Sequence, residues 1–215
     1  MKYRKRVNAF KVFLMVLLAL ATVFLVGAGT VWFLISKDLS REVFHSNQEN
    51  ISDKTPSDMG LTYEEVEYAV GDGVTIRGWF IDAASKKCIV MAPGKGRTKA
   101  DFLNLSPSLH ERGYDLLLFD PRNTGESERD KWGFGYFESR DILAGIEFSR
   151  QEYGDDSFGV LGVSTGASAA LMAALTTDEI SAVVADSPFA SIKLAAENYG
   201  NYGTKPFFRL TFPLY

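Results

Sequence analysis

The chain has 215 residues, enough for one domain of ordinary size and an appendage. Hydrophobic residues make up 46% of it and aromatic residues 13%, which is typical of a packed globule and excludes a disordered chain. The one cysteine, Cys88, excludes an internal disulfide scaffold. With two histidines and no Cys/His ligand spacing, we expect neither a metal site nor a cofactor.

Positive charge is concentrated at the N-terminus, where residues 1–11 hold five basic side chains and no acidic one. The remaining 18 basic residues face 27 acidic ones, which leaves a net charge of −9. Because nucleic-acid binding needs a basic face, this charge excludes it as the function of the domain.

An apolar segment, residues 12–35, follows the basic residues and contains no charge in 24 positions. As a helix it would be about 36 Å long, enough to cross a bilayer core of about 30 Å. Trp32 and Phe33 suit the aromatic belt at the membrane interface. The positive-inside rule puts residues 1–11 in the cytoplasm and the domain outside, on a single-pass anchor in the cell membrane. A signal peptide cleaved near Val26-Gly27-Ala28 is the alternative.

The rest of the chain divides into a polar linker, residues 36–60, and a domain, residues 61–215. The domain opens with a predicted hairpin whose turn is Gly71-Asp72-Gly73. Strands and helices then alternate, which predicts a mostly parallel sheet with helices on both faces and ligands bound beyond the carboxyl ends of its strands. The strands are predicted at 63–70, 74–81, 88–92, 115–119, 157–161 and 182–185. The helices are predicted at 99–112, 135–153 and 167–175, with a shorter one that follows Asp186-Ser187-Pro188 and ends at Tyr199.

The pentapeptide Gly162-Val163-Ser164-Thr165-Gly166 lies between a predicted strand and a predicted helix. Gly-x-Ser-x-Gly in that setting indicates a nucleophile elbow, a sharp turn that aims a serine hydroxyl away from the sheet. Glycine suits both flanking positions because side chains there would strike the neighbouring strand and helix. The helix N-terminus beyond Ser164 favours developing negative charge. A glycine-rich turn with an incidental serine is the alternative.

An attacking serine also needs hydrogen-bond donors for the oxyanion, and backbone amides suffice. The amide of Thr165, directly after Ser164, is one candidate, and the loop after the third strand supplies the other. In that loop, Pro93-Gly94-Lys95-Gly96, we assign the amide of Lys95. A simple strand–helix turn is the alternative reading of the loop.

Four motifs occur in order along the chain: Val90-Met91-Ala92-Pro93-Gly94, Gly113-Tyr114-Asp115, Phe119-Asp120-Pro121-Arg122-Asn123-Thr124-Gly125-Glu126-Ser127 and the pentapeptide around Ser164. Together they resemble the α/β-hydrolase superfamily, and most of all bacterial membrane-anchored serine hydrolases of the esterase and peptidase-like kind. The resemblance covers about Leu61 to Ala195. It implies an α/β-hydrolase fold, Ser164 as nucleophile, the amides of Lys95 and Thr165 as oxyanion hole, and a small-molecule or peptide substrate with an ester, thioester or amide bond.

The resemblance further implies a histidine base after the last strand of the fold and an acid usually after the strand before it. Neither strand occurs before Tyr215, so we expect an incomplete α/β-hydrolase domain without the triad acid and histidine. His110 lies on the wrong side of the sheet order to act as the base. Asp186, at the end of the sixth strand, is a candidate acid, with a structural carboxylate as the alternative.

Two other functions compete with a hydrolase. A chain without its last strands could be an inactive remnant or a binding module that self-associates through an exposed sheet edge. Gly94-Lys95-Gly96 also matches part of a dinucleotide-binding fingerprint, but its third glycine is replaced by Lys99. A phosphate-binding P-loop is excluded because Ile89 stands where a glycine is required.

Overall fold

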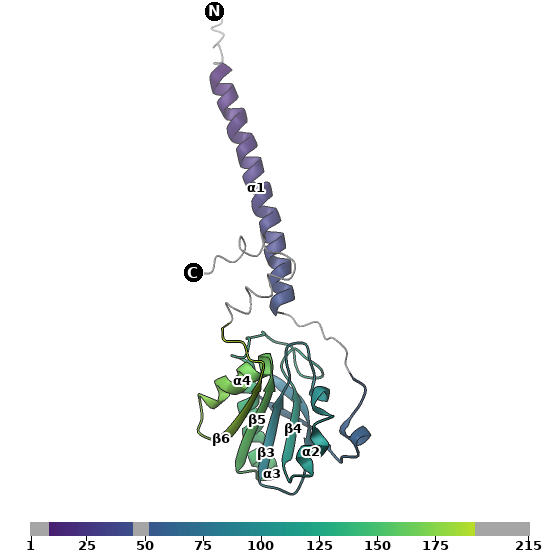
Figure 1. Cartoon of the computed structure of the whole chain (residues 1–215). Coiled ribbons are helices and arrows are strands. Elements are labelled where there is room, and N and C mark those ends of the chain that lie inside the picture. The colour runs from purple at the N-terminus through teal and green to yellow at the C-terminus, as the bar shows by residue number, and fades with distance from the viewer. Residues whose placement is uncertain (1–8, 45–51, 192–215) are drawn as a thin grey trace, which may run out of the picture. The chain divides into compact units, whose positions relative to one another are not determined.

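The computed structural model describes residues 9–44 and 52–191, in two units that divide between Val43 and Phe44. The described residues of the first unit all lie in one helix, α1 (Ala9–Phe44) (Figure 1). Within it, residues 10–37 are long and apolar enough to cross a membrane, and a signal sequence near the N-terminus would meet the same criteria of length and composition. α1 contains the whole of the predicted anchor and continues into the segment predicted as linker.

In the second unit a short 3₁₀ helix, η1 (Pro56–Met59), comes before the predicted hairpin. The hairpin consists of β1 (Glu64–Ala69) and β2 (Thr75–Ile81), which pair antiparallel. The amide of Val70 donates to the carbonyl of Val74 at 2.8 Å, and Gly73 closes the turn with φ +88°. A residue with a side chain rarely adopts that φ, so the glycine explains why the chain reverses there.

The described residues form one six-stranded sheet in the order β1-β2-β4-β3-β5-β6. β2 lies antiparallel to β4, whereas β4, β3, β5 and β6 are parallel to one another, as predicted. The carboxyl ends of these four strands therefore meet at one edge of the sheet (Figure 1). Their bounds are β3 Lys87–Ala92, β4 Asp115–Asp120, β5 Ser157–Val163 and β6 Ile180–Asp186.

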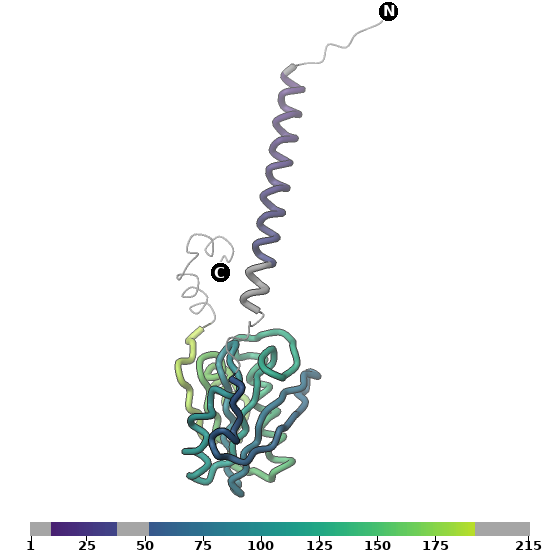
Figure 2. Tube along the Cα trace, turned by 90° about the vertical axis from the view of Figure 1, so that its right-hand side faces the viewer, coloured from purple at the N-terminus to yellow at the C-terminus, as the bar shows by residue number. Residues whose placement is uncertain are grey.

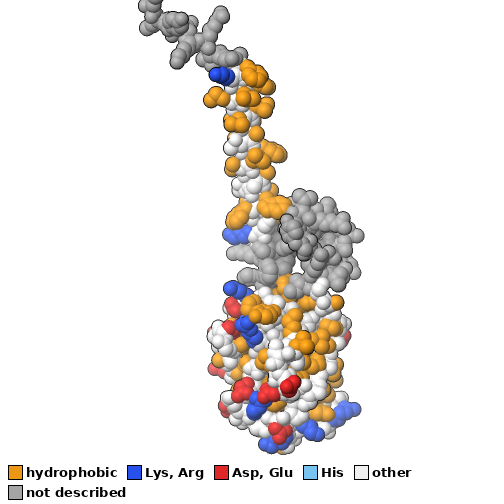
Figure 3. All heavy atoms as spheres, turned by 90° about the vertical axis from the view of Figure 1, so that its left-hand side faces the viewer, with side chains coloured by type: hydrophobic (Ala, Val, Ile, Leu, Met, Phe, Trp, Pro, Cys, Tyr) orange, Lys and Arg blue, Asp and Glu red, His pale blue; other side chains and the backbone are white. Residues whose placement is uncertain are grey.

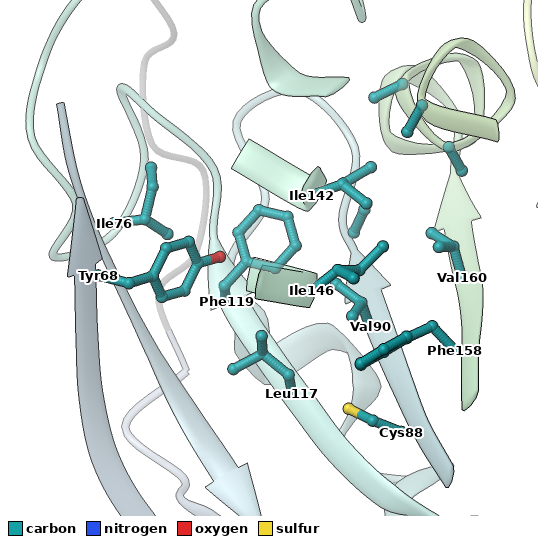
Figure 4. Close-up of a cluster of buried hydrophobic side chains, with 14 of the residues drawn as sticks. Tyr68, Ile76, Cys88, Val90, Leu117, Phe119, Ile142, Ile146, Phe158 and Val160 are labelled. Atoms are coloured by element: carbon teal, nitrogen blue, oxygen red, sulfur yellow. The ribbon is translucent and has the colours of Figure 1, made fainter. Parts of the chain in front are cut away.

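Helices cover both faces of the sheet. Every residue of β4 is buried, and successive side chains enter different cores: Leu117 and Phe119 pack with α3 (Glu138–Tyr153) and α4 (Thr165–Ala174). Figure 4 shows this core. On the other face, Leu116 and Leu118 pack near η2 (Lys99–Phe102), a 3₁₀ helix.

The helix predicted over 99–112 is two short pieces, η2 and α2 (Ser106–His110). Pro107 has no N–H, so it cannot bond back to Leu103 in a continuous helix, and it occupies the first turn of α2 instead. α2 ends at His110 with Glu111 as its C-cap, earlier than the predicted end at Arg112. Gly113 lies in the turn that follows, with φ +76° and its amide donating to the carbonyl of His110 at 2.8 Å.

Apolar side chains are exposed where α4 and β6 border the sheet. Leu171 and Leu175 of the α4 region and Val184 of β6 are all exposed, and Figure 3 shows hydrophobic side chains gathered on this side of the domain. Strands of parallel sheets are ordinarily buried on both faces, so the surface at β6 is unusual for such a strand.

Two buried carboxyl groups, Asp115 and Asp155, lie close together at the amino ends of β4 and β5. Asp115 accepts a hydrogen bond from the amide of Ala83 at 2.6 Å, and Asp155 accepts one from the hydroxyl of Ser149. Within the described residues, Oδ1 of Asp155 has no partner. Burial, followed by the nearby carboxyl of Asp115, raises the pKa of Asp155 to about 6.

We expect Asp155→Asn to stabilise the domain at pH 7 by about 2 kcal/mol. Because the native state holds the Asp155 proton more tightly than the unfolded state, wild-type stability falls as pH rises from about 4 to about 6. The substitution removes that fall, so the advantage should vanish at pH 4. Urea unfolding followed by tryptophan fluorescence measures both values. The exposed neighbour Asp156→Asn is the control; a variant as pH-sensitive as wild type would contradict the assignment.

Glycines allow α4 to approach the sheet more closely than side chains would permit. A Cβ on Gly166 would lie 2.0 Å from the carbonyl oxygen of Ala92 and 2.5 Å from that of Pro93. A Cβ on Gly162 would lie 2.3 Å from the carbonyl oxygen of Gly166. Since these neighbours are backbone atoms, a side chain at either position would separate α4 from β3 or β5.

Gly166→Ala should therefore destabilise the domain by about 3 kcal/mol or more, because the backbone must move to admit the methyl group. Gly71→Ala is the matched control, since nothing lies within 4 Å of its Cβ position. Thermal unfolding of both variants measures the difference. An equal midpoint for Gly166→Ala and wild type would show that α4 does not need this close approach.

Candidate active site

Ser164 occupies the sharp junction between β5, which ends at Val163, and α4, which begins at Thr165. Its backbone has φ +55° and ψ −114°, a conformation that residues other than glycine rarely adopt. Two backbone bonds hold it there: its amide donates to the carbonyl of Asp186 at 2.8 Å, and its carbonyl accepts from Ser168 at 3.1 Å. Ser164 is exposed, so the junction presents its hydroxyl to a reactant.

The loop after β3 reaches this serine. A Cβ on Gly94 would lie 3.3 Å from the Cβ of Ser164 and 3.8 Å from its Oγ. The loop turns there, because the amide of Arg97 donates to the carbonyl of Gly94 at 3.1 Å and Gly96 has φ +73°. Lys95 is thus next in the chain to the glycine that borders Ser164. The role of its amide as an oxyanion donor stays a prediction.

Thr165 is the first residue of α4, a helix of ten residues. The first four amides of a helix have no acceptor within the helix, and they carry the positive end of its dipole. An anionic oxygen that develops at Ser164 would therefore meet a favourable field. Thr165 keeps its predicted place beside the serine, with its side chain buried.

Asp186 is the last residue of β6 and pairs in register with Val163. Its backbone carbonyl holds the amide of Ser164, while its carboxylate accepts a hydrogen bond from the hydroxyl of Ser187 at 2.8 Å. Ser187 also has φ +55°. The structure thus brings Asp186 to the same edge as Ser164, and the proposed role of its carboxyl as an acid stays a prediction.

His110 lies near the amino ends of the parallel strands, at the end of the sheet opposite to Ser164. Its Nε2 is 3.0 Å from the carbonyl oxygen of Asp82, which follows β2. Ile81, the last residue of β2, pairs with Leu116 near the amino end of β4, whereas Ser164 follows the carboxyl end of β5. This agrees with the expectation that His110 is not the base. His45 lies outside the described residues.

A buried carboxylate at the end of β4 joins two of the loops at this edge. Asp120 accepts hydrogen bonds from the amide of Lys99 at 2.9 Å, from its Nζ at 2.7 Å and from the amide of Glu126 at 3.0 Å. Gly125 is required because a Cβ there would lie 1.9 Å from Oδ2 of Asp120. Lys99 also pairs with Glu126 at 2.7 Å and lowers the pKa of that carboxyl.

A buried arginine from the same motif ties the site to the rest of the domain. The guanidinium of Arg122 pairs with Asp141 of α3 at 2.6 Å, with Asp72 of the hairpin turn at 2.9 Å and with Asp130 at 3.3 Å. Both Arg122 and Asp141 are fully buried, so each charge depends on the other.

The sequence analysis included Asp120 and Arg122 only as members of a family motif, and it did not predict the ion pairs that they form. A usable signal was present, since all seven residues in these contacts are ionisable. Four of the seven, Asp120, Arg122, Glu126 and Asp130, lie within residues 120–130. Among residues 9–44 and 52–191, no group of three or more His, Cys, Asp or Glu side chains could hold a metal ion.

Known proteins resemble the domain. The thiohydrolase aneE of Aspergillus aculeatus is 32% identical over 139 residues, 59% of this chain and 42% of that protein. The acyltransferase drtE of Aspergillus calidoustus is 27% identical over 139 residues, 60% of this chain and 44% of that protein. The chain therefore spans less than half the length of these two relatives.

The esterase Pf2001 of Pyrococcus furiosus has a similar solved structure, with a TM-score of 0.69 and 26% identity over 79% of this chain and 68% of that one. Residues 87–203, more than half of the chain, match the family described as the α/β hydrolase fold. That match, together with the sheet order and the junction at Ser164, shows that the chain belongs to the α/β-hydrolase family.

Proposed function

We propose that this protein is a membrane-anchored serine hydrolase that cleaves an ester, thioester or amide bond with Ser164 as nucleophile. The observation that carries the proposal is the strained, exposed Ser164 at the start of α4, bordered by Gly94. Strain of this kind persists only where the surrounding structure enforces it, and it is concentrated at functional sites.

In the proposed reaction, Oγ of Ser164 attacks the substrate carbonyl and gives up its proton to a general base. The carbonyl oxygen becomes an oxyanion that accepts hydrogen bonds from the amides of Thr165 and Lys95. The alcohol, thiol or amine then leaves with a proton, and water hydrolyses the acyl-enzyme by the same steps. The names thiohydrolase, acyltransferase and esterase all describe proteins that act on acyl groups, which favours an acyl substrate here.

We propose that a histidine other than His110 acts as the base, because His110 lies near the amino ends of the parallel strands, away from Ser164. The chain spans less than half the length of aneE and drtE, and we propose that the part of such a protein that this chain does not cover supplies the histidine. Asp186 is suitably placed to orient such a histidine, although its bond to Ser187 also suits a structural role.

An inactive remnant or binding module is the second candidate. It is favoured by the exposed apolar side chains at β6, which would promote self-association through the sheet edge. The two candidates differ in whether the folded protein reacts at Ser164.

Ser164→Ala should abolish labelling by a fluorophosphonate probe, because the probe phosphorylates an activated serine oxygen. Ser187→Ala, which changes a second exposed serine with φ +55° at the same edge, should keep most of the labelling. Mass spectrometry of the labelled peptides measures both. A folded wild-type protein that takes up no label would favour the inactive module.

We further propose that residues 12–35 anchor the protein, with residues 1–11 cytoplasmic, 36–60 as linker and the domain outside. Deletion of residues 1–35 should move the protein from the membrane pellet to the supernatant after carbonate extraction, because it removes the apolar part of α1. Recovery of wild-type protein in the supernatant, with its N-terminus after Ala28, would instead identify a cleaved signal peptide.

A further inference from the structure

Phe134 adopts a backbone conformation that is unfavourable for its side chain. Its φ is +50°, in the left-handed region, where a bulky residue is a rare outlier. The adjacent Gly135 has φ +98°, so the chain makes an unusual turn before α3. Such a conformation needs an external cause, because the local sequence does not favour it.

Glu138 supplies that cause. Its carboxylate accepts hydrogen bonds from the amide of Gly133 at 2.9 Å and from the amide of Gly135 at 2.7 Å, the residues on either side of Phe134. Glu138 is buried, and burial raises the pKa of its carboxyl. These two bonds also explain why α3 begins at Glu138 and not at the predicted Gly135, because residues 133–136 form a separate turn closed by the amide of Tyr136.

The clamped turn lies against the first turn of α4. A Cβ on Gly135 would lie 3.1 Å from the amide nitrogen of Ala169 and 3.3 Å from the Cβ of Ser168. Ser168 in turn donates its amide to the carbonyl of Ser164 at 3.1 Å. Phe134 is therefore held next to the helical turn that starts at the proposed nucleophile.

A second aromatic ring comes from the chain that leaves β6. The amide of Phe189 donates to the hydroxyl oxygen of Ser168 at 3.3 Å, and its ring meets that of Phe134 edge to face, with centroids 6.5 Å apart. Both rings are half-buried. Figure 2 shows the loop after β4 and residues 187–191, which follow β6, at the same end of the domain.

We propose that Phe134 and Phe189 form an apolar wall of the substrate site and bind the hydrocarbon part of the acyl group that Ser164 attacks. This inference rests on the proposed function and adds the substrate class, an acyl group with an extended alkyl or aryl chain. Glu138 is a positioning residue, which acts by holding Phe134 against its backbone preference. Two partly exposed rings beside a polar reaction centre suit such a mixed substrate.

The test compares reactive alkyl fluorophosphonates with a methyl and a decyl chain on the full-length protein. Phe134→Ala and Phe189→Ala should each slow labelling of Ser164 by the decyl compound about tenfold and leave the methyl compound within twofold. Tyr136→Ala, an exposed aromatic residue of the same turn, is the matched control and should change neither rate. Equal losses for both chain lengths, or none, would overturn the proposed wall.

Glu138→Gln keeps the shape of the side chain but replaces one acceptor oxygen by a donor, so one amide loses its partner. We expect the ratio of decyl to methyl labelling to fall severalfold. General destabilisation would slow both compounds equally and would not change this ratio, so an unchanged ratio would remove Glu138 from the proposal.

A binding measurement separates this inference from the proposed function. Calorimetry with unreactive decylphosphonate on Ser164→Ala protein needs no catalysis, and adding Phe134→Ala should weaken binding about tenfold. If no compound labels wild-type Ser164 but this difference persists, the hydrolase proposal fails and the apolar wall stands. If labelling occurs but decylphosphonate binds equally with and without Phe134, the wall fails and the hydrolase proposal stands.

Discussion

The close contact between α4 and the ends of β3 and β5 is the constraint on which the candidate site depends. Gly166 lies against the carbonyls of Ala92 and Pro93, so the helix N-terminus, the loop after β3 and Ser164 share one small volume. The turn that permits this contact forces Ser164 to φ +55°. Backbone strain and the exposure of a hydroxyl above helix amides thus have one geometric cause, which is why they occur together.

Buried charges keep the surrounding loops in place. Asp120 binds both the main chain and the side chain of Lys99, and Arg122 links the β4 loop to α3 and to the hairpin turn. A buried ion pair adds little net stability over apolar packing, but loss of one partner leaves an uncompensated charge and is costly. We interpret these ion pairs as interactions that stabilise one conformation of the loops at the carboxyl ends of the strands. The hydrogen bonds of Glu138 stabilise the turn at Phe134 in the same way.

The differences from the predicted helices follow from the same contacts. Periodicity alone extends one helix over 99–112, but Asp120 holds Lys99 in a 3₁₀ turn and Pro107 starts a new helix. Periodicity likewise extends α3 back to Gly135. In the structure the carboxylate of Glu138 accepts a hydrogen bond from the amide of Gly135, which belongs to a separate turn before α3. The end of α3 at Tyr153 was predictable because a left-handed glycine, Gly154, terminates a helix locally.

Patterns that act over a few residues were therefore readable from the amino acids: the hairpin, the alternation that makes a mostly parallel sheet, and the glycines around Ser164. Contacts between residues distant in the chain were not. Arg122 with Asp72, Gly94 with Ser164 and Phe134 with Phe189 meet only when strands and loops pack. Hydrogen bonds and side-chain rotation extend only a few ångströms, so the partner across a sheet edge is determined by strand order and packing, and local sequence carries no record of it.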